Sequence, residues 1–161
     1  MVRLIIGFAA LVGAAGCSGE GDTVGRENAR SHFQTHRVAY ERLVELVRSC
    51  ELTGTLWAET PAREDVSCSQ VEHSTDPLVA ALRDAEAISV TRIPAHAAMP
   101  SGGVAIVVSI RGLGVSGSLE RFIYSSQPVT EPPSDEGDVA SGVERVAITP
   151  PPYQWWWERS Y

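Results

Sequence analysis

The sequence predicts an α+β fold in which an N-terminal amphipathic helix and a short second helix pack on an antiparallel sheet of four to five strands. Residues 27–50 repeat their apolar positions at helical spacing. The second half of the chain holds short runs that alternate apolar and polar residues, as half-buried strands do. Short connections join these runs, whereas parallel strands would need crossovers of about a dozen residues, so antiparallel pairing is expected.

The first residues are expected to direct export rather than to join the fold. Arg3 precedes an apolar run that ends at Gly16, and charge, apolar core and small residues come in the order of a signal peptide. The run from Leu4 to Gly16 is 13 residues long, and a membrane-spanning helix needs about 20. Residues 1–16 are therefore expected to be removed.

The tetrapeptide Ala14-Ala15-Gly16-Cys17 resembles the lipobox of bacterial lipoproteins. The resemblance covers only the first 17 residues and implies that Cys17 is lipidated and becomes the new N-terminus. The family usually has Leu where Ala14 stands, so cleavage by the ordinary signal peptidase remains an alternative. Ser18 resembles the pattern that sorts Gram-negative lipoproteins to the outer membrane, where the domain would face the periplasm. Residues 17–26 would form a flexible tether, and residues 27–161 a single domain.

Two helices are expected in the domain. The first spans residues 27–50, with charged residues on the face opposite its apolar residues. The second begins at Asp76-Pro77, because Asp is a favourable N-cap and proline fits the first helical turn. Between them lies an expected loop that holds Trp57, Pro61 and Cys68.

Four runs and a C-terminal aromatic segment are the predicted strands. They cover residues 87–93, 103–110, 119–125, 143–149 and 153–158. Residues 128–142 hold prolines and acids but no basic residue, and are expected to form a solvated loop.

Cysteine parity predicts one disulfide. With Cys17 assigned to the lipid, Cys50 and Cys68 remain, in a chain expected to enter an oxidising compartment. The alternative is a pair of buried free thiols.

The segment 112–117 matches the G-x-G-x-x-G pattern of dinucleotide-binding loops. A dinucleotide-binding fold requires a helix after this loop and an acidic residue at the end of a following strand. Here the segment after the glycines shows no helical face, and no acidic residue stands at a following strand end. Glycines also suit a hairpin connection, so we interpret the segment as a turn and expect no cofactor.

Two other sets of residues suggest metal chemistry. His32 and His36 lie four apart on the first predicted helix, so both rings can approach one ion. The sequence shows no third ligand, and we expect no metal there. The acidic residues 131–138 lack the order of a calcium loop and are interpreted as part of the solvated loop.

The tail holds three consecutive tryptophans, Trp155, Trp156 and Trp157. On a strand, Trp155 and Trp157 point to one face and Trp156 to the other. An exposed indole could stack on a sugar or a lipid boundary, whereas buried indoles would close the core. These tryptophans are the candidate ligand-binding residues.

Composition and motifs restrict the function classes. All 13 basic residues are arginine and face 20 acidic ones, so the net charge is -7, unlike a nucleic-acid binder with its basic patch. No nucleophile elbow or other catalytic motif appears, so we expect no enzyme. The expected protein is a membrane-anchored envelope lipoprotein with a non-catalytic interaction or structural role, and an envelope protein or glycan as partner. The alternative is an extracytoplasmic module that binds glycan, peptidoglycan or an apolar ligand through the tryptophans.

Overall fold

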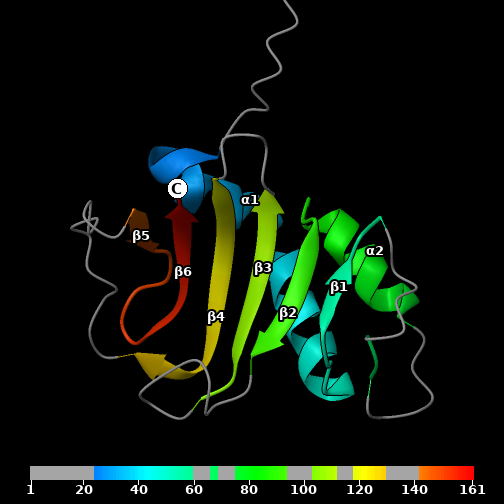
Figure 1. The fold of residues 1–161 in the computed structure, drawn as a ribbon. Helices are drawn as coiled ribbons and strands as arrows, with labels where there is room; N and C mark the ends of the chain where they lie inside the picture. Colours follow the sequence, from blue (N-terminus) through cyan, green and yellow to red (C-terminus); the bar gives the residue numbers. More distant parts are fainter. Residues whose placement is uncertain (1–23, 60–65, 69–74, 94–102, 112–117, 130–141) are drawn as a thin grey trace, which may run out of the picture.

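The described part of the chain forms one antiparallel sheet of six strands, in the order β1-β2-β3-β4-β6-β5, with two helices on one face (Figure 1). The computed structural model describes residues 24–59, 66–68, 75–93, 103–111, 118–129 and 142–161. The elements are α1 (Gly25–Cys50), β1 (Thr55–Trp57), α2 (Asp76–Asp84), β2 (Ser89–Ile93), β3 (Ala105–Arg111), β4 (Leu119–Val129), β5 (Val143–Ala147) and β6 (Tyr153–Ser160). Every neighbouring pair is antiparallel, which confirms the predicted α+β class.

The sheet has one more strand than predicted. β1 lies in the segment expected to be a loop, and it forms the edge of the sheet by pairing with β2. Of its three residues only Leu56 is buried, while Trp57 is 37% exposed. A strand this short shows too little alternation to be recognised from sequence.

The boundaries of the other elements differ slightly from those predicted. α2 begins at Asp76 itself, with Thr75 at the N-cap, so Asp76 does not occupy the expected cap position. β4 continues to Val129, beyond the predicted end of that run. The last strand, β6, lies inside the sheet between β4 and β5.

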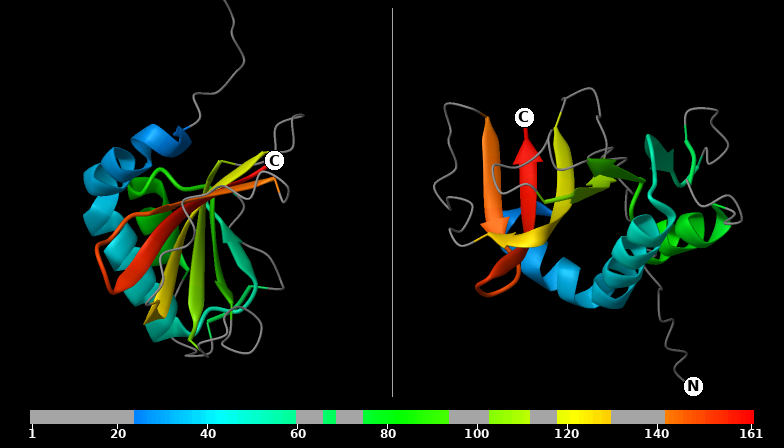
Figure 2. Two further views of the ribbon diagram at one scale, coloured as in Figure 1. Left: turned by 90° about the vertical axis from the view of Figure 1, so that its left-hand side faces the viewer. Right: turned by 90° about the horizontal axis from the view of Figure 1, so that it is seen from below.

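The main core lies between the helices and the sheet face that they cover. The left view of Figure 2 shows both helices on that one face of the sheet. Residues that alternate along β3, β4 and β6 face the helices, as the period of a strand requires. The largest fully buried side chains there are Trp157, Tyr40, Phe33, Phe122, Leu43, Leu52, Leu56, Leu82 and Ile106.

The N-terminus of α1 is capped by a side chain from the sheet. Val24 at the N-cap makes no side-chain cap hydrogen bond. The carboxylate of Glu120, at the start of β4, accepts hydrogen bonds from the backbone N–H groups of Val24 (2.9 Å) and Gly25 (3.3 Å). Glu120 is 1% exposed, and Arg159 on β6 brings its Nε within 3.7 Å. This carboxylate therefore satisfies two of the N–H groups that a helix start leaves unpaired.

Cys50 and Cys68 form a disulfide, as cysteine parity predicted. Cys50 is the last residue of α1, and Cys68 follows the bridge between Thr53 and Ser67. Their Cα atoms lie 4.8 Å apart, within the usual range for a disulfide. The bond thus ties the end of α1 to the segment that follows β1.

The sheet face away from the helices carries a buried carboxylate between two arginines. Glu158 is 4% exposed and accepts hydrogen bonds from Arg121 and Arg145 on the flanking strands. Burial by itself raises the pKa of Glu158, but the hydrogen bonds and charges of Arg145 and Arg121 outweigh it and hold the pKa below its usual value. The carboxylate is therefore ionised and paired in the folded protein.

Several predicted features lie outside the described residues: Cys17 with the signal segment, the glycines of residues 112–117, and the acidic residues 131–138. The strands on either side of the glycine segment pair antiparallel, and β4 follows it where a dinucleotide-binding loop would be followed by a helix.

Among the described residues, no helix combines the length and apolar character needed to span a membrane.

Candidate functional site

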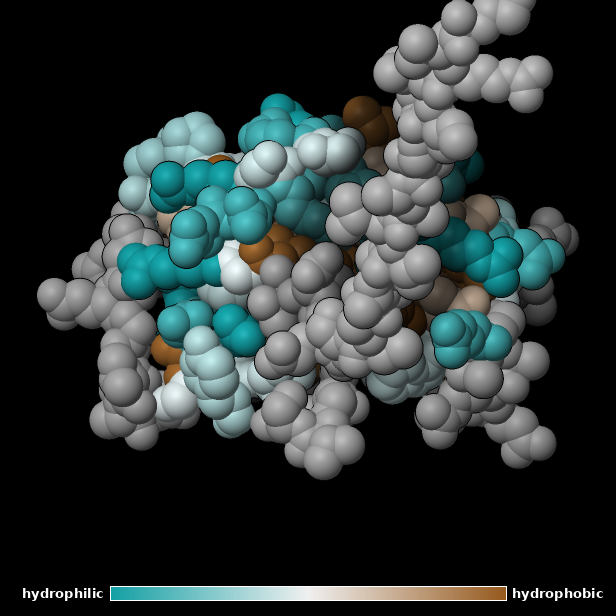
Figure 3. Space-filling model, turned by 90° about the horizontal axis from the view of Figure 1, so that it is seen from above, coloured by the Kyte–Doolittle hydropathy of each residue, from teal (hydrophilic) through white to brown (hydrophobic). Residues whose placement is uncertain are grey.

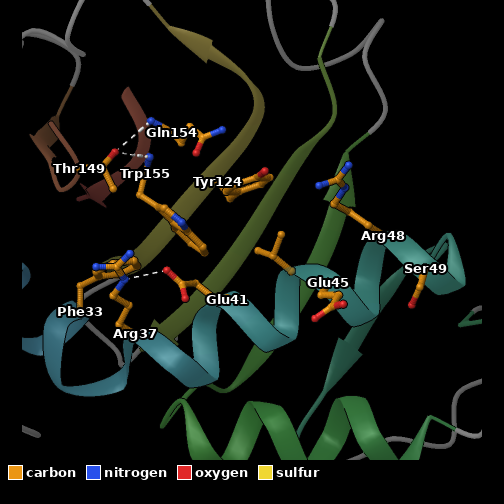
Figure 4. A pocket seen from close by; sticks show the side chains of 11 residues that line it. Phe33, Arg37, Glu41, Glu45, Arg48, Ser49, Tyr124, Thr149, Gln154 and Trp155 are labelled. Carbon is orange, nitrogen blue, oxygen red and sulfur yellow. Dashed lines mark hydrogen bonds and ion pairs between the residues drawn. The ribbon is translucent and has the colours of Figure 1, made fainter. Parts of the chain in front are cut away.

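A groove of about 640 Å³ lies between α1 and the part of the sheet where β6 begins (Figure 4). Three regions line it: the exposed flank of α1, the middle of β4, and the turn between β5 and β6 with the start of β6. Pockets for small ligands typically measure about 300 to 1,000 Å³. The groove is therefore large enough for a ligand of one or two rings with substituents.

The floor of the groove is aromatic. Phe33 from α1, Tyr124 from β4 and Trp155 from β6 pack together, with Trp155 5.0 Å from Phe33 and 5.2 Å from Tyr124 between ring centroids. Phe33 and Trp155 are almost wholly buried, whereas Tyr124 is half-buried. Tyr124 therefore supplies the accessible part of the floor, and the buried rings of Trp155 and Phe33 support it from below.

The rim along α1 carries both signs of charge. Arg37, Glu41, Glu45 and Arg48 follow one another along the flank of the helix above the floor (Figure 4). Arg37 donates a hydrogen bond to Glu41 at 2.7 Å. Helical spacing sets this order, because residues three or four apart lie on the same face.

The opposite rim is polar and ordered by Thr149. Its hydroxyl oxygen accepts hydrogen bonds from the backbone N–H groups of Gln154 (3.0 Å) and Trp155 (3.2 Å). These bonds hold the start of β6 beside the turn that precedes it, and they place Gln154 at the groove. The groove therefore combines an apolar floor with hydrogen-bonding groups on both sides.

The three tryptophans predicted as candidate ligand-binding residues are divided between the two faces of the sheet. Trp155 and Trp157 face the helices, while Trp156 packs on the other face with Ala105 and Ile123. Their exposed fractions are only 5%, 6% and 0% for Trp155, Trp156 and Trp157. None of them forms an exposed platform, and Trp155 is the one that borders the groove.

No family model, curated protein or solved structure matched this chain. The functional argument therefore depends on the geometry and chemistry of the described residues.

A second cluster lies on the other flank of α1. His32 and His36 are joined there by Glu86, which follows the end of α2, and ligand atoms of the three residues lie within 4.8 Å of one another. The sequence placed the two histidines together but not Glu86, which is 50 positions from His36. Only the packing of α2 against α1 brings this carboxylate to the histidines.

Sequence analysis also missed the groove residues of α1. Arg37, Glu41, Glu45 and Arg48 have the pattern of an ordinary solvated helix face, which is what the sequence predicted. The charged face alone gives no sign of a groove, because the groove exists only where β4 and β6 pass beneath that flank.

Proposed function

We propose that this protein is a membrane-anchored envelope lipoprotein whose domain binds a peptidoglycan fragment in the groove between α1 and the sheet. The observation that carries the proposal is the aromatic floor beneath a rim of mixed charge, where the half-buried Tyr124 ring packs against Trp155, which in turn packs against Phe33. Binding sites of this kind combine apolar walls with a few well-placed polar groups.

Peptidoglycan fragments have the complementary chemistry. The apolar faces of sugar rings stack on aromatic side chains, and their hydroxyl and amide groups need hydrogen-bonding partners such as Gln154. The peptide stem carries carboxylates, which suit Arg48, and amino groups, which suit Glu45. A wholly apolar ligand would desolvate these charged groups without pairing them, at a cost in affinity.

The position of the groove suits a domain held near a membrane. Helix α1 begins beside Glu120 on β4. The groove lies at Tyr124, four residues further along the same strand and thus roughly 13 Å away. The end of the molecule where α1 begins is shown in Figure 3, and hydrophilic side chains predominate among its described residues. A tether on Cys17 would join the domain at that end, and the groove lies further along β4.

The anchor is tested by replacing Cys17 with serine. Because diacylation holds a chain in the bilayer, the wild-type protein should appear in the membrane fraction with an intact mass that begins at Cys17 plus acyl chains. The Cys17→Ser variant should lose the acyl mass and leave the membrane fraction. A wild-type mass without lipid would contradict the anchor and leave the groove proposal to its own test.

The groove is tested by titrating the protein with a soluble disaccharide-peptide fragment of peptidoglycan while tryptophan emission is recorded. Binding beside Trp155 should change the emission, and the change should persist in Trp57→Phe, because Trp57 lies on the edge strand β1. Arg48→Gln should weaken binding about tenfold, as expected for one charge-assisted hydrogen bond.

Arg42→Gln is the matched control for Arg48→Gln. Arg42 is exposed on α1 and does not line the groove, so this variant should bind as the wild type does. Equal weakening by both variants would indicate a nonspecific charge effect. An unchanged emission in the wild type, with no binding by calorimetry, would refute the proposed ligand class.

A further inference from the structure

We propose that His32, His36 and Glu86 form a binding site for one divalent transition-metal ion, with Zn²⁺ the ion that fits the ligand set best. The site is independent of the groove, because it lies on the other flank of α1 and none of its residues lines the groove. Two imidazoles and one carboxylate are a donor set that zinc accepts with a water as fourth ligand.

The geometry of His36 leaves one nitrogen available for the ion. Its Nδ1 lies 3.2 Å from the backbone oxygen of Asp84. A carbonyl oxygen only accepts, so Nδ1 carries the hydrogen and Nε2 keeps its lone pair in the neutral ring. Nε2 is 3.7 Å from the Glu86 carboxylate. Orientation of one ring nitrogen by a backbone carbonyl is a usual feature of histidine ligands in metal sites.

His32 is held in place by its neighbours. Its ring stacks on Phe122 at 5.8 Å between centroids and lies 4.7 Å from the His36 ring. Its Nε2 is 3.3 Å from the Tyr40 hydroxyl. When His32 binds the ion through Nδ1, the hydrogen on Nε2 can be donated to Tyr40.

Glu86 occupies a backbone position that normally favours glycine. Its φ is 51°, in the left-handed region, and it follows the end of α2 in a Schellman arrangement, with Ala87 N–H bonded to Leu82 O and Glu86 N–H to Arg83 O. The side chain of Glu86 is 68% exposed. Because glycine suits this left-handed conformation, Glu86 can be replaced with glycine without backbone strain.

The three side chains need only a small rearrangement to bind an ion. Ligand atoms around tetrahedral zinc lie about 3.3 Å apart, given bonds of about 2.0 to 2.1 Å. The corresponding atoms here lie within 4.8 Å of one another. Glu86 is the most exposed of the three ligands, so its side chain has room to turn toward the rings. The bound ion would link α1 to the turn after α2.

The test uses the chain purified from its host, from whichever fraction contains it, and treated with a chelator before Zn²⁺ is added in a calorimeter. One Zn²⁺ per chain is expected, and Co²⁺ in its place should show the visible absorption of a low-symmetry four-coordinate site. His36→Ala should weaken Zn²⁺ binding at least 100-fold, since changes even to residues behind metal ligands cost about 10- to 100-fold. Zn²⁺ should also raise the thermal midpoint of the wild type, because it binds only the folded site.

Two glycine substitutions separate metal binding from folding. Glu86→Gly should lose Zn²⁺ binding while the thermal midpoint of the metal-free protein stays the same or rises, since glycine suits the left-handed backbone. Glu51→Gly is the matched control, because Glu51 has a φ of 49° after α1 and lies outside the cluster. It should keep Zn²⁺ binding. Failure of the wild type to bind, or binding that survives both His36→Ala and Glu86→Gly, would overturn the proposal.

Discussion

Replacement of Glu120 with alanine is expected to lower the free energy of unfolding by about 3 kcal/mol, in the range typical for breaking a buried, hydrogen-bonded charge pair. The substitution leaves the backbone N–H groups of Val24 and Gly25 without their acceptor and removes the carboxylate beside Arg159. Because Glu120 is 1% exposed, water cannot easily replace it. Urea unfolding monitored by circular dichroism measures the change, and the denaturant slope should stay constant.

Two further variants show whether the lost helix cap causes the lower free energy of unfolding. Glu120→Gln keeps the shape and one acceptor oxygen, so its loss should be clearly smaller than that of Glu120→Ala. Glu27→Gln removes an exposed carboxylate from the first turn of α1 and should cost less than about 1 kcal/mol, the size of a surface helix-dipole effect. A Glu120→Ala protein as stable as the wild type would show that the cap contributes nothing.

Removal of the Cys50–Cys68 disulfide is the second large effect. The two cysteines are 18 positions apart, and closing a loop of this size restricts the unfolded chain by about 3 kcal/mol. Replacing both cysteines with alanine should therefore lower the thermal midpoint by roughly 10 °C for a domain of this size. Differential scanning calorimetry measures this shift.

A reducing agent provides the control for this experiment. Reduction of the wild type should lower its midpoint by a similar amount, because the same constraint is lost. Reduction should leave the double alanine variant unchanged. A wild-type midpoint that does not respond to reduction, with both thiols shown to be free, would contradict the predicted stabilisation.

The helices and most strands could be predicted because their signals are local. Helix α1 repeats its apolar residues along 26 positions, and β3 alternates so regularly that one face is evident from the sequence. The disulfide followed from counting cysteines in a chain that the sequence predicts to be exported. Strand β1 was missed because three residues carry too little pattern, and its position is decided by pairing with β2.

The candidate sites could be predicted only in part, because their residues come from distant segments. The unusual tail indicated Trp155, whereas the spacing of His32 and His36 was weighed and led to the expectation of no metal. The groove that Trp155 borders, and Glu86 beside the histidines, depend on how α1 packs against the sheet and against α2. No local signal distinguishes Glu86 from any other acid at a helix end.

The sequence by itself determined the fold class, the disulfide and the division of Trp155 and Trp156 between opposite faces, because periodicity and parity are properties of the chain. The tertiary structure alone decided that β6 lies inside the sheet, that Glu120 caps a helix 95 residues away, and that charged residues of α1 overhang aromatic rings. These arrangements join residues that are far apart in the chain. They arise from the burial of one apolar helix face on one apolar sheet face, which brings polar groups at the margins of both into contact.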